Sequence, residues 1–267
     1  MSISPGTHVV YTVIPGDTLY KIANQFGTSV PSLTQANAIY PPITDPGLIY
    51  PGQKLLVRVP GMSQQSAVLY QVASGDTLYR IAQDYSVGVD MLAALNRMEQ
   101  PNILRVAQLI YIPAFVYDVE PGDSLYRISR RFGVSMSELA RANRNRPGLS
   151  PDVIYPGYSL VIPFPSSTNI VVLQPMPGMK IAPGQTLSGF ARAFEANVLY
   201  QIVDASGAIV SRERAVTAAE GAPAFGRFDA ALQFDRTPAV QGGALLVYTR
   251  SAKDGSIQDL VEVSVSF

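Results

Sequence analysis

Few side chains in this 267-residue chain are of the kinds that support catalysis. The sequence has no cysteine and one histidine, His8. A cysteine nucleophile is therefore excluded, and so are a zinc site with several histidine ligands and a Ser-His-Asp triad. We expect His8, which lies beside the first predicted strand, to be a surface residue rather than a ligand. Acid–base chemistry by paired carboxylates is the remaining catalytic possibility.

A glycosidase needs only two carboxylates, and the C-terminal part of the chain supplies candidates for them. The candidates are Glu195, Asp204, Glu213, Glu220, Asp229 and Asp235. They alternate with apolar residues in a region of short predicted strands, which is typical of solvent-facing strand positions and turns. We therefore predict a protein that is not an enzyme and that uses no metal or cofactor.

A five-residue motif, Gly-Asp-(Thr or Ser)-Leu-Tyr, occurs three times. The copies are Gly16–Tyr20, Gly75–Tyr79 and Gly122–Tyr126. An asparagine follows the aspartate of each copy by 20 residues, at Asn37, Asn96 and Asn143. A motif with a shared downstream landmark indicates true internal repeats, which decide the architecture.

Each copy reads as strand, helix, helix and strand. A run rich in β-branched and aromatic residues opens each copy, and an apolar run closes it. The first helix of copy one has Leu19, Ile22, Ala23 and Phe26 on one face, at the spacing of an amphipathic helix. The Asp-Thr or Asp-Ser pair supplies oxygens that can accept from free N–H groups at the helix start. We predict that the two strands pair antiparallel with both helices on one face.

Capping signals support the second helix and the end of the first. Ser29 and Ser135 are predicted N-caps, and Ser135 with Glu138 forms the S-x-x-E capping box. Gly27 and Gly133 stand where a left-handed C-cap belongs. Copy two has Ser86 at that position, so we expect its first helix to end less sharply.

The three copies resemble the LysM domain. The resemblance rests on Y-x-V-x-x-G-D-[ST]-L-Y-x-I-[AS], then L-x-x-x-N, then Y-P-G-x-x-L, and it places repeats at residues 8–59, 67–113 and 114–163. Copy two replaces the Tyr-Pro-Gly turn with Arg105-Val106-Ala107. We expect that this change removes one shaped wall of its binding groove and makes copy two the weakest binder.

The resemblance implies a ligand rich in N-acetylglucosamine, either peptidoglycan or chitin. It places the groove between the strand-to-helix turn and the loop after the second helix. The implied residues are Gly16, Asp17, Thr18, Leu19, Leu48 and Ile49; Gly75, Asp76, Thr77, Leu78, Ile103 and Leu104; and Gly122, Asp123, Ser124, Leu125, Val153 and Ile154. The motif Asp, Thr and Leu also suit helix capping and packing, so a structural role and a binding role both remain open for them.

The linkers between copies differ in composition. Residues 61–66 are rich in Gly, Ser and Gln, which predicts a flexible linker that leaves copy one free to move. Copies two and three meet at Pro113-Ala114, so we expect them to be fixed relative to each other. Copy three also has a local excess of arginines, which we interpret as a solvated face. They are Arg130, Arg131, Arg141, Arg144 and Arg146.

Residues 169–267 change to short alternating runs separated by turns. About seven strands in roughly 100 residues predict an immunoglobulin-like sandwich. The segment resembles the immunoglobulin-like domain of bacterial sporulation and germination proteins through four motifs in order. These are Pro175-x-Pro177-Gly178, Gly189-x-Ala191-x-x-Phe194-Glu195, Gly221-Ala222-Pro223 with Gly226-x-Phe228, and Ser251-x-x-Asp254-Gly255. The overall fold class is thus α+β followed by all-β.

The charge balance and the N-terminal sequence limit the ligand classes and the cellular locations that we expect for this protein. Lys+Arg and Asp+Glu both number 20, so no net field favours nucleic acid or an anionic membrane. No apolar run is long enough to span a bilayer. Met1–Thr7 shows no signal peptide, yet the implied ligand lies in the cell wall or spore envelope. For a protein of the forming spore no export signal is needed, because the mother cell engulfs the forespore. An envelope scaffold that binds another protein through the sandwich is the alternative to glycan binding.

Overall fold

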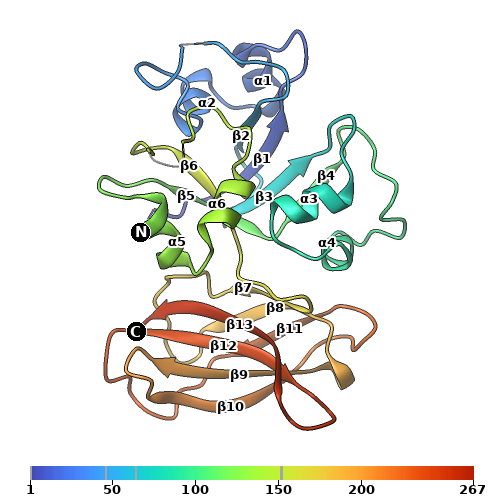
Figure 1. Ribbon diagram of the computed structural model, residues 1–267, viewed down its shortest axis with the longest axis vertical. Coiled ribbons are helices and arrows are strands. Elements are labelled where there is room, and N and C mark those ends of the chain that lie inside the picture. Colours follow the sequence, from blue (N-terminus) through green and yellow to red (C-terminus); the bar gives the residue numbers. More distant parts are fainter. Residues whose placement is uncertain (1, 46, 64, 151–152) are drawn as a thin grey trace. The chain divides into compact units, whose positions relative to one another are not determined.

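The computed structural model describes residues 2–45, 47–63, 65–150 and 153–267 (Figure 1). Each of the three motif-bearing copies, called repeats 1 to 3 from here on, is a βααβ unit, as predicted. Repeat 1 comprises β1 (Thr7–Thr12), α1 (Leu19–Phe26), α2 (Val30–Ala36) and β2 (Lys54–Val59). Repeat 2 comprises β3 (Ala67–Gln71), α3 (Leu78–Asp84), α4 (Val89–Leu95) and β4 (Leu109–Ile112). Repeat 3 comprises β5 (Ala114–Asp118), α5 (Leu125–Phe132), α6 (Met136–Ala142) and β6 (Ser159–Pro163).

The predicted caps set the helix ends. Ser29 accepts from the Ser32 amide, and Ser135 with Glu138 forms the reciprocal capping box. Gly27 ends α1 in the left-handed region at φ 65°. Ser86 adopts the same region at φ 56°, and the amide of the next residue, Val87, donates back to the Ala82 carbonyl. The expectation of a poorly defined end for α3 is therefore wrong, because the chain accepts a strained serine to make the same stop.

The asparagine landmark joins the second helix to the closing strand. Asn37 is fully buried; its Nδ2 donates to the carbonyls of Leu33 and Leu56, while its Oδ1 accepts from the Leu56 amide. Asn143 makes the equivalent three bonds with Leu139 and Val161. One amide side chain thus satisfies backbone groups that would otherwise be buried without partners.

Repeats 1 and 2 share one sheet. Their strands form a four-stranded sheet in the order β2-β1-β3-β4, in which β1 and β3 pair in parallel from Thr7↔Ala67 to Val10↔Tyr70. The prediction that the 61–66 linker leaves repeat 1 free is therefore wrong. The linker composition is permissive, but strand pairing across it fixes repeat 1 against repeat 2.

Arg146 ties repeat 3 to repeat 1. It is 6% exposed, and its guanidinium donates to Asn143 Oδ1 and to the Ser159 carbonyl within its own repeat. Across the interface it donates to the Ala36 carbonyl at 3.0 Å and to Asn37 Oδ1 at 3.1 Å. Burial lowers the pKa of Arg146. The interpretation of the arginine cluster as a solvated face is thus wrong for this residue.

The C-terminal segment is a sandwich of two antiparallel sheets. One sheet has the order β10-β9-β12-β13 and the other β11-β8-β7. The strands are β7 (Ile170–Gln174), β8 (Thr186–Ala191), β9 (Asn197–Asp204), β10 (Ile209–Thr217), β11 (Gly226–Ala231), β12 (Gly242–Arg250) and β13 (Ile257–Ser266), with a short turn of 3₁₀ helix, η1 (Phe194–Ala196), before β9. A hairpin turn at 204–207 joins β9 to β10, and a turn that includes Asp254-Gly255 joins β12 to β13.

The two sheets enclose one apolar core. Alternate residues of the last strand, Val261, Val263 and Val265, are buried in it together with Phe228. A Cβ at Gly189 would lie 2.2 Å from the Val171 carbonyl oxygen, so only glycine allows β8 to approach β7 there. The immunoglobulin-like sandwich predicted from strand spacing is confirmed. No helix in the described parts of the chain is long and apolar enough to cross a bilayer.

Candidate functional site

Two turns meet at one end of every βααβ unit. In repeat 1 the Val13 amide donates to the Gln53 carbonyl at 2.8 Å, and the Gly52 amide donates to the Val13 carbonyl at 2.9 Å. Repeats 2 and 3 make the same pair of bonds through Val72 and Val119. The turn after the first strand and the turn before the last strand are therefore held side by side three times.

The predicted groove residues take the same three environments in each repeat. The motif leucines Leu19, Leu78 and Leu125 are buried in the cores. The first apolar residue of each loop is exposed: Leu48 at 50%, Ile103 at 59% and Val153 at 46%. The next residue, Ile49, Leu104 or Ile154, is half-buried.

In repeat 1 the structure brings the turn and the loop into contact. Ile49 packs against the core cluster that contains Leu19. Leu48, which precedes Ile49, leaves its apolar surface in solvent, and Gly16 and Thr18 of the turn are exposed as well. The motif leucine is therefore a core residue, and Leu48 is the accessible apolar side chain of the loop.

Each motif aspartate is held by a tyrosine six residues earlier. The Tyr11 hydroxyl donates to Asp17 Oδ2 at 2.7 Å, and the same oxygen accepts from the Ile14 amide at 2.9 Å. Repeats 2 and 3 repeat both bonds with Asp76 and Asp123. Sequence analysis assigned the aspartate oxygens to the helix start, and that assignment is wrong. The tyrosine was in the motif, and its constant spacing from the aspartate was the signal that could have revealed the pair.

The helix start is capped by the hydroxyl residue alone. Thr18 accepts from the Lys21 amide, Thr77 from the Arg80 amide and Ser124 from the Arg127 amide, at 3.1–3.2 Å. Since the hydroxyl oxygen accepts, its proton remains available to donate outward. The Lys21 ammonium donates to the Gly16 carbonyl at 2.8 Å, and the Arg127 guanidinium donates to the Gly122 carbonyl at 2.9 Å. In repeats 1 and 3 these long basic side chains thus stabilise the strand-to-helix turn.

Repeat 2 builds its closing turn without the Pro-Gly sequence. Ala107 adopts φ 67° where Gly52 has 89° and Gly157 has 85°, and its amide donates to Val72 at 2.8 Å. The expected loss of a groove wall is therefore wrong at the level of the backbone. Repeat 2 differs in its side chains, since Arg105 and Val106 replace a tyrosine and a proline.

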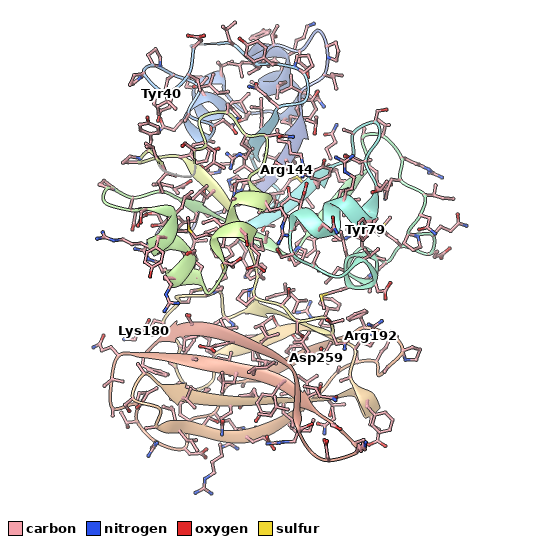
Figure 2. All side chains as sticks on the ribbon, viewed as in Figure 1. Tyr40, Tyr79, Arg144, Lys180, Arg192 and Asp259 are labelled. Carbon is pink, nitrogen blue, oxygen red and sulfur yellow. The ribbon has the colours of Figure 1, made fainter. Side chains whose placement is uncertain are left out.

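The groove residues implied by the sequence do not include the tyrosine that ends each five-residue motif, although all three repeats expose it. Tyr20, Tyr79 and Tyr126 follow the buried motif leucine, and all three side chains are more than half exposed. Figure 2 shows Tyr79 on α3, where its hydroxyl accepts from Gln83 Nε2 at 2.6 Å. An aromatic residue kept in three copies at a position outside the core was the signal that could have identified it.

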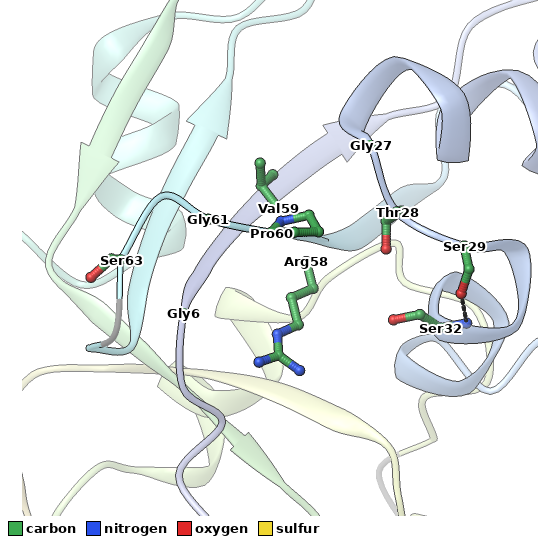
Figure 3. Close-up of a pocket in the computed structure, with 10 residues that line it drawn as sticks. All are labelled: Gly6, Gly27, Thr28, Ser29, Ser32, Arg58, Val59, Pro60, Gly61 and Ser63. Atoms are coloured by element: carbon green, nitrogen blue, oxygen red, sulfur yellow. Dashed lines mark hydrogen bonds between the residues drawn. The ribbon is translucent and has the colours of Figure 1, made fainter.

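Two cavities of the first unit contain none of the predicted groove residues. One of about 630 Å³ is at the opposite end of repeat 1, between the α1–α2 turn and the end of β2, and its lining includes Thr28, Ser29 and Arg58 (Figure 3). A second, of about 260 Å³, lies between repeats 1 and 3 and includes His8. The candidate site is therefore described by the exposure and the hydrogen bonds of its residues rather than by an enclosed cavity.

His8 is not the surface residue that the sequence suggested. It is 2% exposed, and its Nδ1 lies 3.2 Å from the Gly6 carbonyl oxygen. Burial lowers its pKa to about 4, with Asp118 opposing and Arg58 reinforcing that effect. Its neutral ring is a packing element of the β1 strand.

Four of the six carboxylates considered for catalysis are engaged in structural contacts. Glu213 pairs with Arg250, Asp229 with Arg227 and Asp235 with Arg214, at 2.6–2.8 Å. Asp204 is buried and caps its own turn by accepting from the amides of Ser206 and Ala208. The prediction of solvated positions is therefore wrong for Asp204. Among the described residues there is no group of three or more metal-ligating side chains.

The chain thus contains a small βααβ unit that is repeated three times, each time with the same pair of turns. The LysM domain family matches residues 11–58, 70–113 and 117–163, and this chain belongs to that family. The immunoglobulin-like domain of bacterial spore germination matches residues 169–256. Both resemblances expected from the sequence are confirmed.

Similar proteins share only part of this architecture. A secreted LysM effector of Passalora fulva is 30% identical over 122 residues, which cover 40% of this chain and 54% of the effector. An autolysin of Enterococcus faecalis is 40% identical over 105 residues, 34% of this chain and 14% of the autolysin. Among solved structures, a spore cortex-lytic enzyme of Bacillus cereus is 32% identical over 42% of this chain and 23% of its own, with a TM-score of 0.29. The chain thus spans about half or less of these relatives.

Proposed function

We propose that this protein is a non-catalytic, multivalent binder of N-acetylglucosamine-containing glycans, peptidoglycan or chitin, in the bacterial cell wall or spore envelope. The observation that supports it most is the threefold repetition of one paired-turn arrangement. Each copy offers an exposed apolar loop residue and an exposed hydroxyl residue in its strand-to-helix turn. Such a pair suits an N-acetylated sugar, since its methyl and ring faces are apolar and its amide and hydroxyls are polar.

The proposed contact residues are the eighteen named from the sequence, with different roles. We propose that Leu48, Ile103 and Val153 make apolar contact and that Thr18, Thr77 and Ser124 donate hydrogen bonds. The motif aspartates act indirectly by fixing the turn, and the motif leucines form the floor. We propose domain boundaries at 8–59, 67–113, 114–163 and 169–267.

Multivalency follows from the joining of the repeats. A single open groove is expected to bind weakly, and linked sites on one polymer can raise avidity by about 10²–10⁴ when their spacing permits. The shared sheet joins repeat 1 to repeat 2, and the Arg146 contacts join repeat 3 to repeat 1, which supports a defined spacing of the proposed grooves. We therefore propose that the protein selects glycan arrangements that match that spacing.

The test compares full-length variants in calorimetric titration with a chitin oligomer and in binding to purified peptidoglycan sacculi. We expect Leu48→Ser, Ile103→Ser and Val153→Ser each to weaken binding, and the triple variant to lose sacculus binding. Met136→Ser, on an exposed apolar residue of α6, is the matched control. Unchanged binding by the triple variant would contradict the groove, and release of muropeptides or reducing ends by the pure protein would contradict the non-catalytic assignment.

A further inference from the structure

The immunoglobulin-like sandwich contains a cavity of about 400 Å³ at one end. Its walls come from η1 and from the β12–β13 hairpin, and they include Phe194, Glu195, Arg192 and Asp259. Figure 2 labels Arg192 and Asp259 at this end of the sandwich. The volume falls within the range of small-molecule sites, roughly 300–1,000 Å³.

One of the residues that line the cavity is an aromatic residue, Phe194, whose side chain is largely exposed. Phe194 is 67% exposed, although burial of so large an apolar side chain is favourable. The backbone beneath it is anchored, because the Ala218 amide donates to Ala196 and the Ala222 amide donates to Ala193, both at 2.8 Å. Glu195 and Ala196 hold left-handed φ values of 52° and 57°. The fold therefore presents this ring on a fixed and strained bend.

The polar wall is preorganised by a chain of hydrogen bonds. Arg192 Nε donates to Asn169 Oδ1 at 2.9 Å, and Asn169 Nδ2 donates to Asp259 Oδ2 at 2.9 Å. The Arg192 guanidinium also lies over the Phe225 ring, 4.8 Å from its centroid. Planar polar side chains fixed in this way offer donors and acceptors at set positions.

The charges of the wall balance. The lining contains two arginines, Arg192 and Arg250, and two carboxylates, Glu195 and Asp259, so the formal charges of the lining residues sum to zero. A site with no net charge gives no electrostatic preference for phosphate or carboxylate ligands. The combination of an exposed ring and alternating planar donors and acceptors instead matches the apolar ring face and the neighbouring hydroxyls of a pyranose.

From these observations we propose that the sandwich carries its own binding site for a neutral carbohydrate, with Phe194 stacking on the sugar ring. This site is separate from the three LysM grooves, and its existence does not depend on their function. It gives the last domain a direct role in contact with polysaccharide.

The test is a titration of the ¹⁵N-labelled full-length protein with chitopentaose and with maltopentaose, followed by amide chemical shifts. We expect resonances of Phe194, Glu195 and Asn197 to shift and saturate with at least one sugar. Phe194→Ala should weaken this binding at least about tenfold while the shifts in the LysM repeats stay unchanged. Glu195→Gln should weaken it several-fold, and Val240→Ala, at another exposed apolar residue of the sandwich, should leave it intact.

Two outcomes would overturn the proposal. One is that the amide resonances of the cavity residues shift with neither sugar at about 10 mM, a concentration above the millimolar Kd of a weak single site. The other is a cavity response to inorganic phosphate with none to the sugars, which would mark an anion site. Because the LysM resonances are read in the same spectra, failure of the grooves and failure of this site are distinguished.

Discussion

Asp84 of repeat 2 lies 3.1 Å from the ammonium of Lys54 in repeat 1. The same carboxylate is 2.7 Å from the guanidinium of Arg144 in repeat 3, so one acidic side chain connects all three repeats. Asp84 and Lys54 are both buried, which makes this pair sensitive to loss of either partner.

We expect Asp84→Asn to destabilise the LysM region by about 3 kcal/mol, because it leaves the buried Lys54 ammonium without its counter-charge. Urea unfolding measures the change. Glu99→Gln in the same repeat, at an exposed site, should change stability by less than about 0.5 kcal/mol. The double variant Asp84→Asn/Lys54→Met should recover part of the loss, and strict additivity of the two single changes would argue against the pairing.

The left-handed turn residue before the last strand gives a reciprocal pair of variants. Ala107→Gly should stabilise the protein by about 0.5–1 kcal/mol, since φ 67° is strained for alanine but not for glycine. Gly52→Ala should destabilise it by a similar amount, because open space around Gly52 leaves strain as the only penalty. Thermal unfolding of both variants tests this, and shifts of the same sign would contradict it.

Because His8 is buried, the free energy of unfolding should decrease as the pH falls through the mildly acidic range. Its folded pKa of about 4 lies below its ordinary value of 6.5, so the unfolded chain takes up a proton first as the pH falls. Stability is therefore full above about pH 6.5 and decreases down to about pH 4, by on the order of 3 kcal/mol. His8→Gln should flatten this part of the profile of unfolding free energy against pH. An unchanged slope in the variant would assign the acid sensitivity to other groups.

The tyrosine–aspartate pair predicts an alkaline dependence. Burial and the Asp17 carboxylate raise the pKa of Tyr11, so its contribution is complete below the ordinary tyrosine value of about 10 and is lost as the pH rises above it. Tyr11→Phe should cost about 1–2 kcal/mol at pH 7 through loss of the bond to a charged acceptor. The difference between the two proteins should shrink in unfolding measured above pH 10. Tyr20→Phe, on an exposed tyrosine, is the control.

Local signals allowed much of this fold to be predicted from the sequence. Caps such as Ser29 and Ser135 act within one turn of the chain, so their residue types determine the outcome directly. Strand periodicity likewise predicted the sandwich, because alternate valines of β13 face its core. The groove residues were implied by the resemblance to the LysM domain and stay a prediction, and the structure shows in addition that the tyrosine after each motif leucine is exposed.

Contacts between distant residues could not be predicted in this way. Arg146 carries no sequence mark that separates it from Arg144, yet one is buried between repeats and the other is half-exposed. His8 and Asp204 are likewise buried by neighbours that local sequence does not specify. The conformations of Ser86 and Ala107 show a related limit, since backbone pairing imposed φ values that their residue types disfavour.

Because β1 pairs with β3 in parallel, repeat 1 is joined to repeat 2 by strand hydrogen bonds as well as by the covalent linker. A protease that cuts the chain between residues 60 and 66 would divide repeat 1 from the rest of the polypeptide. The two fragments would still share the sheet hydrogen bonds, the Lys54–Asp84 ion pair and the Arg146 contacts. A nicked protein should therefore migrate as one particle under native conditions and separate only in denaturant, and it should keep the spacing of its three grooves.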